Sequence, residues 1–469
     1  MATTIPPAGT SSPSSSLPSG PFVPSVPSDP ARPARPVRPP SPSGWRTVVR
    51  GNVLMMGLVS FFTDASSEMI YPLLPIFFTG LVPVGLAAIY IGLMEGVAEA
   101  AASLLKIVAG RWSDRIGKRK VFAVAGYGLS SLVRPVMAVA TAGWHLVFMR
   151  FLDRVGKGLR TSPRDALISD SVDPSVRGLA FSFHRAMDHL GAVVGPLAAV
   201  GILFCFLGYG LWRGESDVAS DEEMRAMRWL FAIALVPGIL ATLTLVFWVR
   251  EIVPKPKPAA PSPGSAQTGQ AAGRLEPLPR RFYYFLSAVT LFTLGNSSDL
   301  FLVFYAKTLF HLGLLQVIGL WVALHISKIV FSIPGGILSD RLGRRVTIVA
   351  GWLVYALVYI AMAFVGEGQQ GLFWALIVAY GAFYGLTEGS EKALVADFVA
   401  SEHRGRAFGY YHGAVGLAAL PASLLFGVFW AVIGPRWAFG IGAILAAVAT
   451  VLLATLLSSD HEGRARIEE

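Results

Sequence analysis

Residues 110–120 read Gly-Arg-Trp-Ser-Asp-Arg-Ile-Gly-Lys-Arg-Lys, and residues 336–346 read Gly-Ile-Leu-Ser-Asp-Arg-Leu-Gly-Arg-Arg-Val. Both stretches are strongly charged, and both lie between long apolar segments. Only 14% of the 469 residues are charged, against roughly 25% in an average soluble protein. Charge that is concentrated in this way marks short loops between membrane-spanning helices. The repeat of these two hinge loops predicts a membrane protein built from two similar halves.

The apolar segments are long enough to cross a bilayer, which takes roughly 20 residues of helix. Six precede and six follow a stretch rich in Pro, Ala, Gly and Ser at 250–281. This predicts an all-α membrane protein of about twelve transmembrane helices, in two six-helix bundles related by pseudo-two-fold symmetry. The expected spans are 52–78, 88–109, 121–141, 144–169, 178–207 and 227–249, then 282–307, 315–338, 346–365, 371–397, 406–432 and 436–457.

The segments outside the bundles are predicted to be tails and a linker. The first residues are rich in Pro and Ser without an apolar core, so we expect a disordered tail rather than a cleaved signal peptide. Basic residues gather in alternate loops, which predicts that both termini are cytoplasmic in a plasma (bacterial inner) membrane. The expected divisions are tail 1–50, first bundle 51–250, linker 251–281, second bundle 282–457 and tail 458–469.

Two further pairs of segments repeat between the halves. Phe61–Glu68 parallels Phe292–Asp299, and Asp165–Asp170 parallels Lys392–Asp397. Position 336 follows 110 by 226 residues, and position 292 follows 61 by 231, so the offset is nearly constant. Parallel repeats of six spans are a known plan for transporters.

These motifs resemble those of the major facilitator superfamily, of the twelve-span bacterial type, across residues 50–457. Gly191–Pro196 in the fifth span is similar to the motif of the family's proton antiporters, and Arg154–Gly158 looks like its Arg-x-x-Gln-Gly pattern with Lys157 in place of Gln. The resemblance implies export by exchange for protons. The family's loop motif is matched by Gly110, Asp114, Arg115, Gly117, Lys118 and Arg119, and again by Gly336, Asp340, Arg341, Gly343, Arg344 and Arg345.

We expect the hinge loops to form part of a gate. Gly117 and Gly343 permit a tight turn. Asp114 comes at a helix end, where it can accept hydrogen bonds from free backbone amides or pair with a base. The alternative is that the loop bases only anchor the loops to acidic lipid. The expected gate pairs are Asp170 with Arg115 or Lys118, and Asp397 with Arg341 or Arg344; Gly110, Gly336 and Asp340 complete the predicted gate.

A stripe of bases is predicted along the fourth span. The side chains recur at steps of four, three, three and four, which places them on one helix face. Because a charged stripe facing lipid would prevent insertion, it must face water or another helix. It either attracts a substrate with a negative group or forms ion pairs with Asp64, Glu68 or Asp188. The stripe consists of Arg150, Arg154, Lys157, Arg160 and Arg164.

Other polar residues inside the spans supply the remaining candidates. Carboxylates in a partly dry cavity can carry protons near neutral pH, and each could equally be structural. Small residues and a proline are expected to let the fifth span bend, or simply to pack tightly: Gly191, Gly195 and Pro196. Proton or cation coupling is predicted at Glu68, Asp64, Glu95, Glu99 and Asp299. The substrate cavity is predicted from Arg150, Asp153, Arg154, Lys157, Tyr71, His325, Lys328, Glu388 and Glu391.

The sequence therefore predicts a secondary active transporter that moves a small organic solute by alternating access, by proton antiport and as a monomer. It has no phosphate-binding loop, no metalloprotease motif and no Ser/His/Asp arrangement, so we expect no enzyme, no cofactor, no resident metal and no nucleic-acid partner. The alternatives are a proton-coupled symporter for an anionic metabolite, a non-transporting receptor or scaffold, and a metal-cation exporter. Metal ligands could come from Asp64, Glu68, Asp299, His325 and Glu391.

Overall fold

The computed structural model describes residues 48–208, 219–252, 277–312 and 314–456. The predicted tails, apart from residues 48–50, and most of the predicted linker lie outside the described residues. Helices account for all the regular structure of the described part of the chain. The predicted all-α fold is therefore confirmed.

The first bundle contains the six expected spans, each within a few residues of its expected limits. The last of them changes direction at Ala234, three residues before Pro237, whose ring cannot follow a regular helix. Its helices are α2 (Gly51–Ile70), η1 (Tyr71–Leu73), α3 (Leu74–Thr79), α4 (Val84–Ile116), α5 (Arg119–Val136), η2 (Met137–Val139), α6 (Gly143–Asp170), η3 (Pro174–Val176), α7 (Arg177–Leu207), α8 (Asp221–Ile233) and α9 (Leu235–Trp248).

The second bundle repeats this order of spans, with its own interruption in the first of them. The expected span 282–307 is interrupted at residues 296–299, where the chain leaves the helix. Its helices are α10 (Arg280–Gly295), α11 (Leu300–Phe310), α12 (Leu314–Leu342), α13 (Arg344–Met362), α14 (Gln370–Phe398), η5 (Ser401–His403), α15 (Arg404–Ile433) and α16 (Pro435–Leu456).

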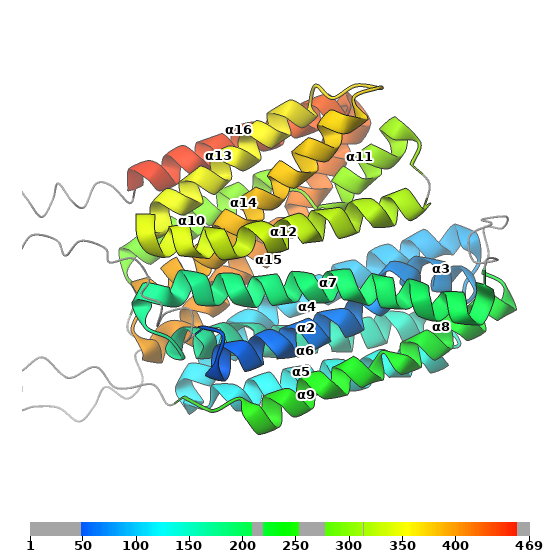
Figure 1. Cartoon of the computed structure of the whole chain (residues 1–469), viewed down its shortest axis with the longest axis horizontal. Helices are drawn as coiled ribbons and strands as arrows, with labels where there is room; N and C mark the ends of the chain where they lie inside the picture. The colour runs from blue at the N-terminus through cyan, green and yellow to red at the C-terminus, as the bar shows by residue number, and fades with distance from the viewer. Residues whose placement is uncertain (1–47, 209–218, 253–276, 313, 457–469) are drawn as a thin grey trace, which may run out of the picture. The chain divides into compact units, whose positions relative to one another are not determined.

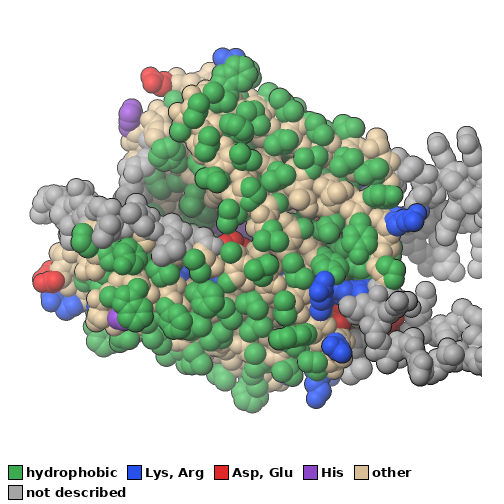
Figure 2. All heavy atoms as spheres, turned by 180° about the vertical axis from the view of Figure 1, so that it is seen from behind, with side chains coloured by type: hydrophobic (Ala, Val, Ile, Leu, Met, Phe, Trp, Pro, Cys, Tyr) green, Lys and Arg blue, Asp and Glu red, His purple; other side chains and the backbone are tan. Residues whose placement is uncertain are grey.

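Within the described residues, ten helical segments are long and apolar enough to cross a membrane. The two remaining expected spans are α4 and α6, which are 33 and 28 residues long and carry several charged side chains each. Figure 2 shows hydrophobic side chains over the lateral surface and charged ones gathered toward its two ends. This distribution suits a protein whose sides face lipid.

The bundles meet through two helix pairs, and the pseudo-two-fold axis relates one pair to the other. In one pair α4 packs on α15, and in the other α7 packs on α12 (Figure 1). Within the bundles, α2 packs on α7 and α9, and α10 packs on α15 and α16. The hinge loops of both bundles lie at one end of these helices, which we name the hinge side.

The described core forms two clusters that differ in position. The larger cluster joins the second bundle, with Phe285 as one member, to the hinge-side part of the first, with Tyr127 and Phe181. The smaller cluster contains only first-bundle residues far from the hinge loops, such as Phe77 and Phe231. The apolar cores of the bundles are thus continuous on the hinge side and separate on the opposite side.

Candidate functional site

The first hinge loop caps a helix of the other bundle. Gly117 ends α4 in a left-handed conformation with φ of 69°, which glycine adopts without strain. The preceding Asp114 carboxylate accepts hydrogen bonds from the amides of Gly405 (2.9 Å) and Arg406 (2.6 Å) at the start of α15. The first amides of a helix have no partner within it, and the helix dipole favours an anion there. An acid of one bundle therefore stabilises a helix start in the other.

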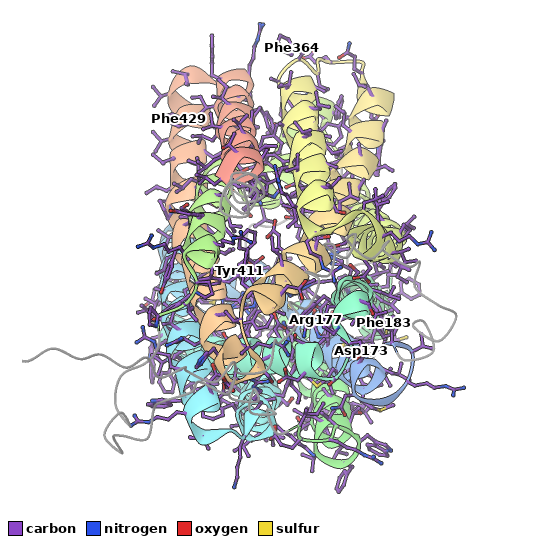
Figure 3. All side chains as sticks on the ribbon, turned by 90° about the vertical axis from the view of Figure 1, so that its left-hand side faces the viewer. Asp173, Arg177, Phe183, Phe364, Tyr411 and Phe429 are labelled. Carbon is purple, nitrogen blue, oxygen red and sulfur yellow. The ribbon has the colours of Figure 1, made fainter. Side chains whose placement is uncertain are left out.

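The second hinge loop makes the same contact in reverse. Gly343 has φ of 95°, and the Asp340 carboxylate accepts hydrogen bonds from Gly178 (3.0 Å) and Leu179 (2.8 Å) at the start of α7. Figure 3 looks onto the hinge side, where Arg177 lies at this end of α7. The repeated motif thus forms two equivalent contacts between the bundles.

Buried ion pairs surround the first contact, and they correct the expected partners of Asp170. Its carboxylate pairs with Arg119 and with Arg404 of the second bundle. Arg119, fully buried at the first turn of α5, also pairs with Asp114 (3.2 Å) and donates to the Ser401 carbonyl. The predicted partners Arg115 and Lys118 are exposed, because the turn at Gly117 directs them outward.

The second contact has its own ion pairs. Asp397 pairs with Arg177 of the first bundle (2.5 Å) and with Arg344 (3.2 Å). Arg344 was one of the two expected partners, whereas the other, Arg341, is exposed. Arg344 also pairs with Asp340 and donates to the Pro174 carbonyl of the first bundle at 2.8 Å.

The basic stripe on α6 divides into fixed and accessible members. Asp153 pairs with Arg134 of α5 (3.1 Å) and with Arg150 (3.4 Å). Arg160 is buried, donates to the Ser130 hydroxyl at 2.7 Å and lies 4.4 Å from the centre of the Tyr127 ring. The arginines of the stripe thus take part in structural networks, in which Arg150 pairs with Asp153 and Arg164 pairs with Asp165. Neither acid is among the expected partners Asp64, Glu68 and Asp188, and attraction of a substrate stays a prediction.

Lys157 is the exposed member of the stripe. It interacts electrostatically with Asp64 of α2 and with Glu99 and Lys106 of α4. Glu99 and Lys106 form an ion pair at 3.4 Å. Lys157 is thus an exposed cation among charged side chains of two neighbouring helices, a placement that contact with lipid would disfavour. The Glu95 side chain lies outside the described ones.

A small pocket lies between α2, α5 and α6. Arg134, Arg150 and Asp153 line it together with Ser67 and Tyr71, and its volume of about 10 Å³ has room for about one water molecule. The Arg150 guanidinium lies 4.7 Å from the centre of the Tyr71 ring, a cation–π contact.

Glu68 lies close to these bases. Its carboxylate interacts electrostatically with Arg150, Arg154 and Lys157, and its Oε2 atom has no hydrogen-bond partner among the described residues. Buried polar atoms of this kind are uncommon in folded proteins, so Glu68 remains a candidate for proton binding.

The glycines of the fifth span hold α7 against α2. A methyl group added at Gly191 would lie 2.5 Å from the Phe61 carbonyl oxygen, and one at Gly195 would lie 2.7 Å from that of Ala65. Pro196 lies inside α7, which continues past it to Leu207. Close packing therefore accounts for the glycines, and bending at Pro196 stays a prediction.

In the second bundle the interrupted helix forms a polar cluster. Asp299, at the end of the interruption, accepts hydrogen bonds from Lys328 (2.7 Å) and from the hydroxyls of Tyr380 and Tyr384 (both 2.9 Å). Glu391 accepts hydrogen bonds from Trp352 (3.0 Å) and Tyr411 (2.7 Å). The described residues contain no group of three or more His, Cys, Asp or Glu side chains that could hold a metal ion.

Two inter-bundle contacts involve residues that were not predicted as site residues. Asp165 of α6 pairs with His412 (2.7 Å) and Lys392 (3.4 Å), both of the second bundle. His189 of α7 contacts Glu388 and His325. The sequence contains one indication of the contact between Asp165 and Lys392, because these residues occupy matching positions in the sequence repeat and carry opposite charges.

Comparison with known proteins gives the family. The model of the Major Facilitator Superfamily matches residues 56–327 and 312–469. An uncharacterised MFS-type transporter of Methanocaldococcus jannaschii is 34% identical over 408 residues, which cover 86% of this chain and 94% of that protein. A multidrug resistance protein, MdtH, of Edwardsiella ictaluri is 30% identical over 148 residues, 32% of this chain and 36% of that protein.

Solved structures share the fold. The human organic anion transporter MFSD10 superposes with a TM-score of 0.68 at 16% identity, covering 88% of this chain and 100% of that one. The fucose:proton symporter of E. coli gives 0.64 at 12% identity, with coverage of 86% and 97%. The helix order, the repeated hinge loops and these matches lead to one conclusion: this chain belongs to the Major Facilitator Superfamily and is an integral membrane transporter.

Proposed function

We propose that the protein exports a small organic anion in exchange for protons by alternating access. The exposed Lys157, in an otherwise largely buried basic stripe, carries this proposal. A cation that water can reach inside a bundle attracts anions, and a low-dielectric surrounding strengthens the attraction.

We further propose that the hinge side is cytoplasmic and that this conformation faces outward. Basic residues concentrate in the hinge loops, as the positive-inside rule requires of cytoplasmic loops. Among the described residues, hydrogen bonds between the bundles involve α7 only up to His189, near its middle. The bundles are therefore joined from the hinge side to mid-membrane, which leaves the opposite side open to the exposed Lys157.

Coupling of anion movement to proton movement is supported by Glu68, which lies within electrostatic reach of the same bases that attract the anion, so a proton on Glu68 and a bound anion affect each other's binding. The relative named as a multidrug resistance protein supports the outward direction.

The test uses purified protein in liposomes with a pH-sensitive dye inside and a panel of organic anions outside. Addition of a substrate is expected to drive proton movement in the opposite direction, and Glu68→Gln is expected to abolish it while anion exchange between the two sides persists. Lys157→Gln should raise the half-saturating concentration about tenfold, the loss of roughly 1.4 kcal/mol of binding.

The matched control is Arg280→Gln, which removes an exposed base at the start of α10, on the hinge side. It should leave both proton movement and half-saturation unchanged. An anion-driven proton flux that Glu68→Gln leaves intact contradicts coupling through Glu68. Unchanged half-saturation in Lys157→Gln contradicts the anion site.

A further inference from the structure

Three polar side chains from three helices meet at the middle of the interface between the bundles. His189 comes from α7 of the first bundle, and His325 and Glu388 come from α12 and α14 of the second. The His189 Nε2 atom lies 3.2 Å from Glu388 Oε2, and its Nδ1 atom lies 3.3 Å from His325 Nδ1. Both imidazoles are buried, being 8% and 7% exposed.

The geometry fixes which atoms carry protons. A carboxylate only accepts, so His189 Nε2–H donates to Glu388. The two facing Nδ1 atoms share one proton, because one must donate and the other accept. With both rings neutral, His325 donates and its Nε2 atom is left as a bare acceptor. That atom is buried and has no hydrogen-bond partner among the described residues.

The group can therefore take up one further proton without breaking any of its contacts. The added proton gives the imidazole pair a positive charge, which the neighbouring Glu388 carboxylate stabilises. A second added proton would place two N–H groups face to face. The site thus holds a single exchangeable proton.

Other charges around the group limit how tightly it holds this proton. Bases oppose it and acids favour it, and the group lies between both kinds. The other charged residues on the helices packed around it are Arg185 and Asp188 on α7, Asp64 on α2, Arg164 on α6, Lys328 on α12, and Glu391 and Lys392 on α14. Asp299 already neutralises Lys328 at 2.7 Å, and Asp188 pairs with Arg185 at 2.7 Å.

We propose that His189, His325 and Glu388 form a proton-binding site that exists only while the bundles are joined on the hinge side. His189 belongs to one bundle and its two partners belong to the other, so separation of the bundles takes the site apart. The proton is then taken up while the cavity faces outward and is released when the hinge side opens. This inference rests on the proposed exchange of protons and adds a second place where they bind.

The sign of the pH effect follows from linkage. The Glu388 carboxylate faces His189 at 3.2 Å only in the joined state, and loss of this contact on separation removes the anion that holds the proton. Acidification therefore favours the joined state, and that preference is lost as the pH rises. Unequal proton affinity is required, since a ligand with equal affinity for both states shifts nothing.

The test measures the joined and separated populations directly in the full-length protein. Spin labels are placed at Ile116 and Leu342, which are exposed (both 58%) on opposite bundles of the hinge side, after replacing the exposed Cys205 with serine. In lipid nanodiscs, the population with a short distance between the labels (the joined state) should rise relative to the population with a long distance. The ratio of the two should increase at least about threefold from ~pH 8 to ~pH 5.5, a range that brackets the titration of an ordinary imidazole.

The variants separate this site from other titrating groups. His189→Gln and His325→Gln retain hydrogen-bonding side chains without an imidazole and should abolish the pH effect. Glu388→Gln should displace it to lower pH, because the anion that stabilises the proton is gone. The control, His184→Gln, removes another buried histidine of α7, which lies 3.8 Å from Asp188 within the first bundle, and should respond as the wild type does.

A wild-type pH response that persists in both histidine variants overturns the site, while the liposome flux assay decides independently whether protons are exchanged at all. A Glu388→Gln response identical to that of the wild type overturns it equally. If one histidine variant does not fold, the other two variants still decide the outcome.

Discussion

At the scale of the residue, Arg119 is one of the side chains that join the two bundles on the hinge side. Its side chain is fully buried and touches Asp114, Asp170 and the Ser401 carbonyl, so it contacts both bundles. Removing one member of a buried ion pair leaves an uncompensated charge, which costs about 3–5 kcal/mol. Arg119→Gln is expected to lower the free energy of unfolding by this amount and to lengthen the distance between labels at Ile116 and Leu342.

The matched control for Arg119 is Arg115→Gln. Arg115 is an arginine of the same loop whose side chain is exposed, so its loss should change the free energy of unfolding by less than about 0.5 kcal/mol. Equal destabilisation by both variants contradicts the central role of Arg119, as does a stable Arg119→Gln protein.

Sequence alone could identify the charged loop but not the base that points inward. Arg115, Lys118 and Arg119 lie within five consecutive positions, and all can pair with a carboxylate. The left-handed turn at Gly117 ends one helix, and the next begins at Arg119, which alone is turned toward α6. That direction depends on how α4, α5 and α6 pack, which no local pattern encodes.

At the scale of the element, glycines let helices of the two bundles approach on the hinge side. A methyl group at Gly178 of α7 would lie 2.8 Å from Asp340 Oδ1 and 2.9 Å from the Gly336 carbonyl oxygen, closer than packed atoms tolerate. This conflict exists only while α7 and α12 are together. Overpacking costs about 1–3 kcal/mol, so Gly178→Ala should shift the equilibrium toward the separated state about fivefold or more.

The measurement for Gly178→Ala is again the distance between labels at Ile116 and Leu342. Its control is Gly201→Ala on the same helix, where an added methyl group meets nothing within 4 Å. The control should keep the wild-type distances. An unchanged distance distribution in Gly178→Ala shows that α7 and α12 separate elsewhere or not at all.

Most helices were predictable from apolar length, since the limits of expected and observed spans differ by a few residues. The interruption at 296–299 was not predictable. Phe61–Glu68 and Phe292–Asp299 resemble each other, yet only the first stays helical. Gly295 and Asn296 weaken the second helix locally, and the bonds from Lys328, Tyr380 and Tyr384 hold Asp299 out of it. Those partners come from distant helices.

At the scale of the whole molecule, the two core clusters differ in whether they join the bundles. The shared core lies on the hinge side and the separate one on the opposite side, so the proposed alternating access requires that rocking about mid-membrane break one set of contacts while forming another. The paired charges at both hinge contacts are then lost together, because both lie at the same end. Two equivalent contacts make this switch cooperative rather than gradual.

Alternating access predicts that Lys157 is reachable from one side at a time. A cysteine at this exposed position, in a background without Cys205, should react with a membrane-impermeant thiol reagent from outside intact cells. Adding Gly178→Ala lowers the population of the joined state, so the rate of this reaction from outside should fall by about the same factor. In inside-out vesicles the rate should rise. A cysteine at the fully buried Ser130 is the unreactive control. Equal reactivity from both sides in one variant means an open path through the protein, which contradicts exchange between two closed states.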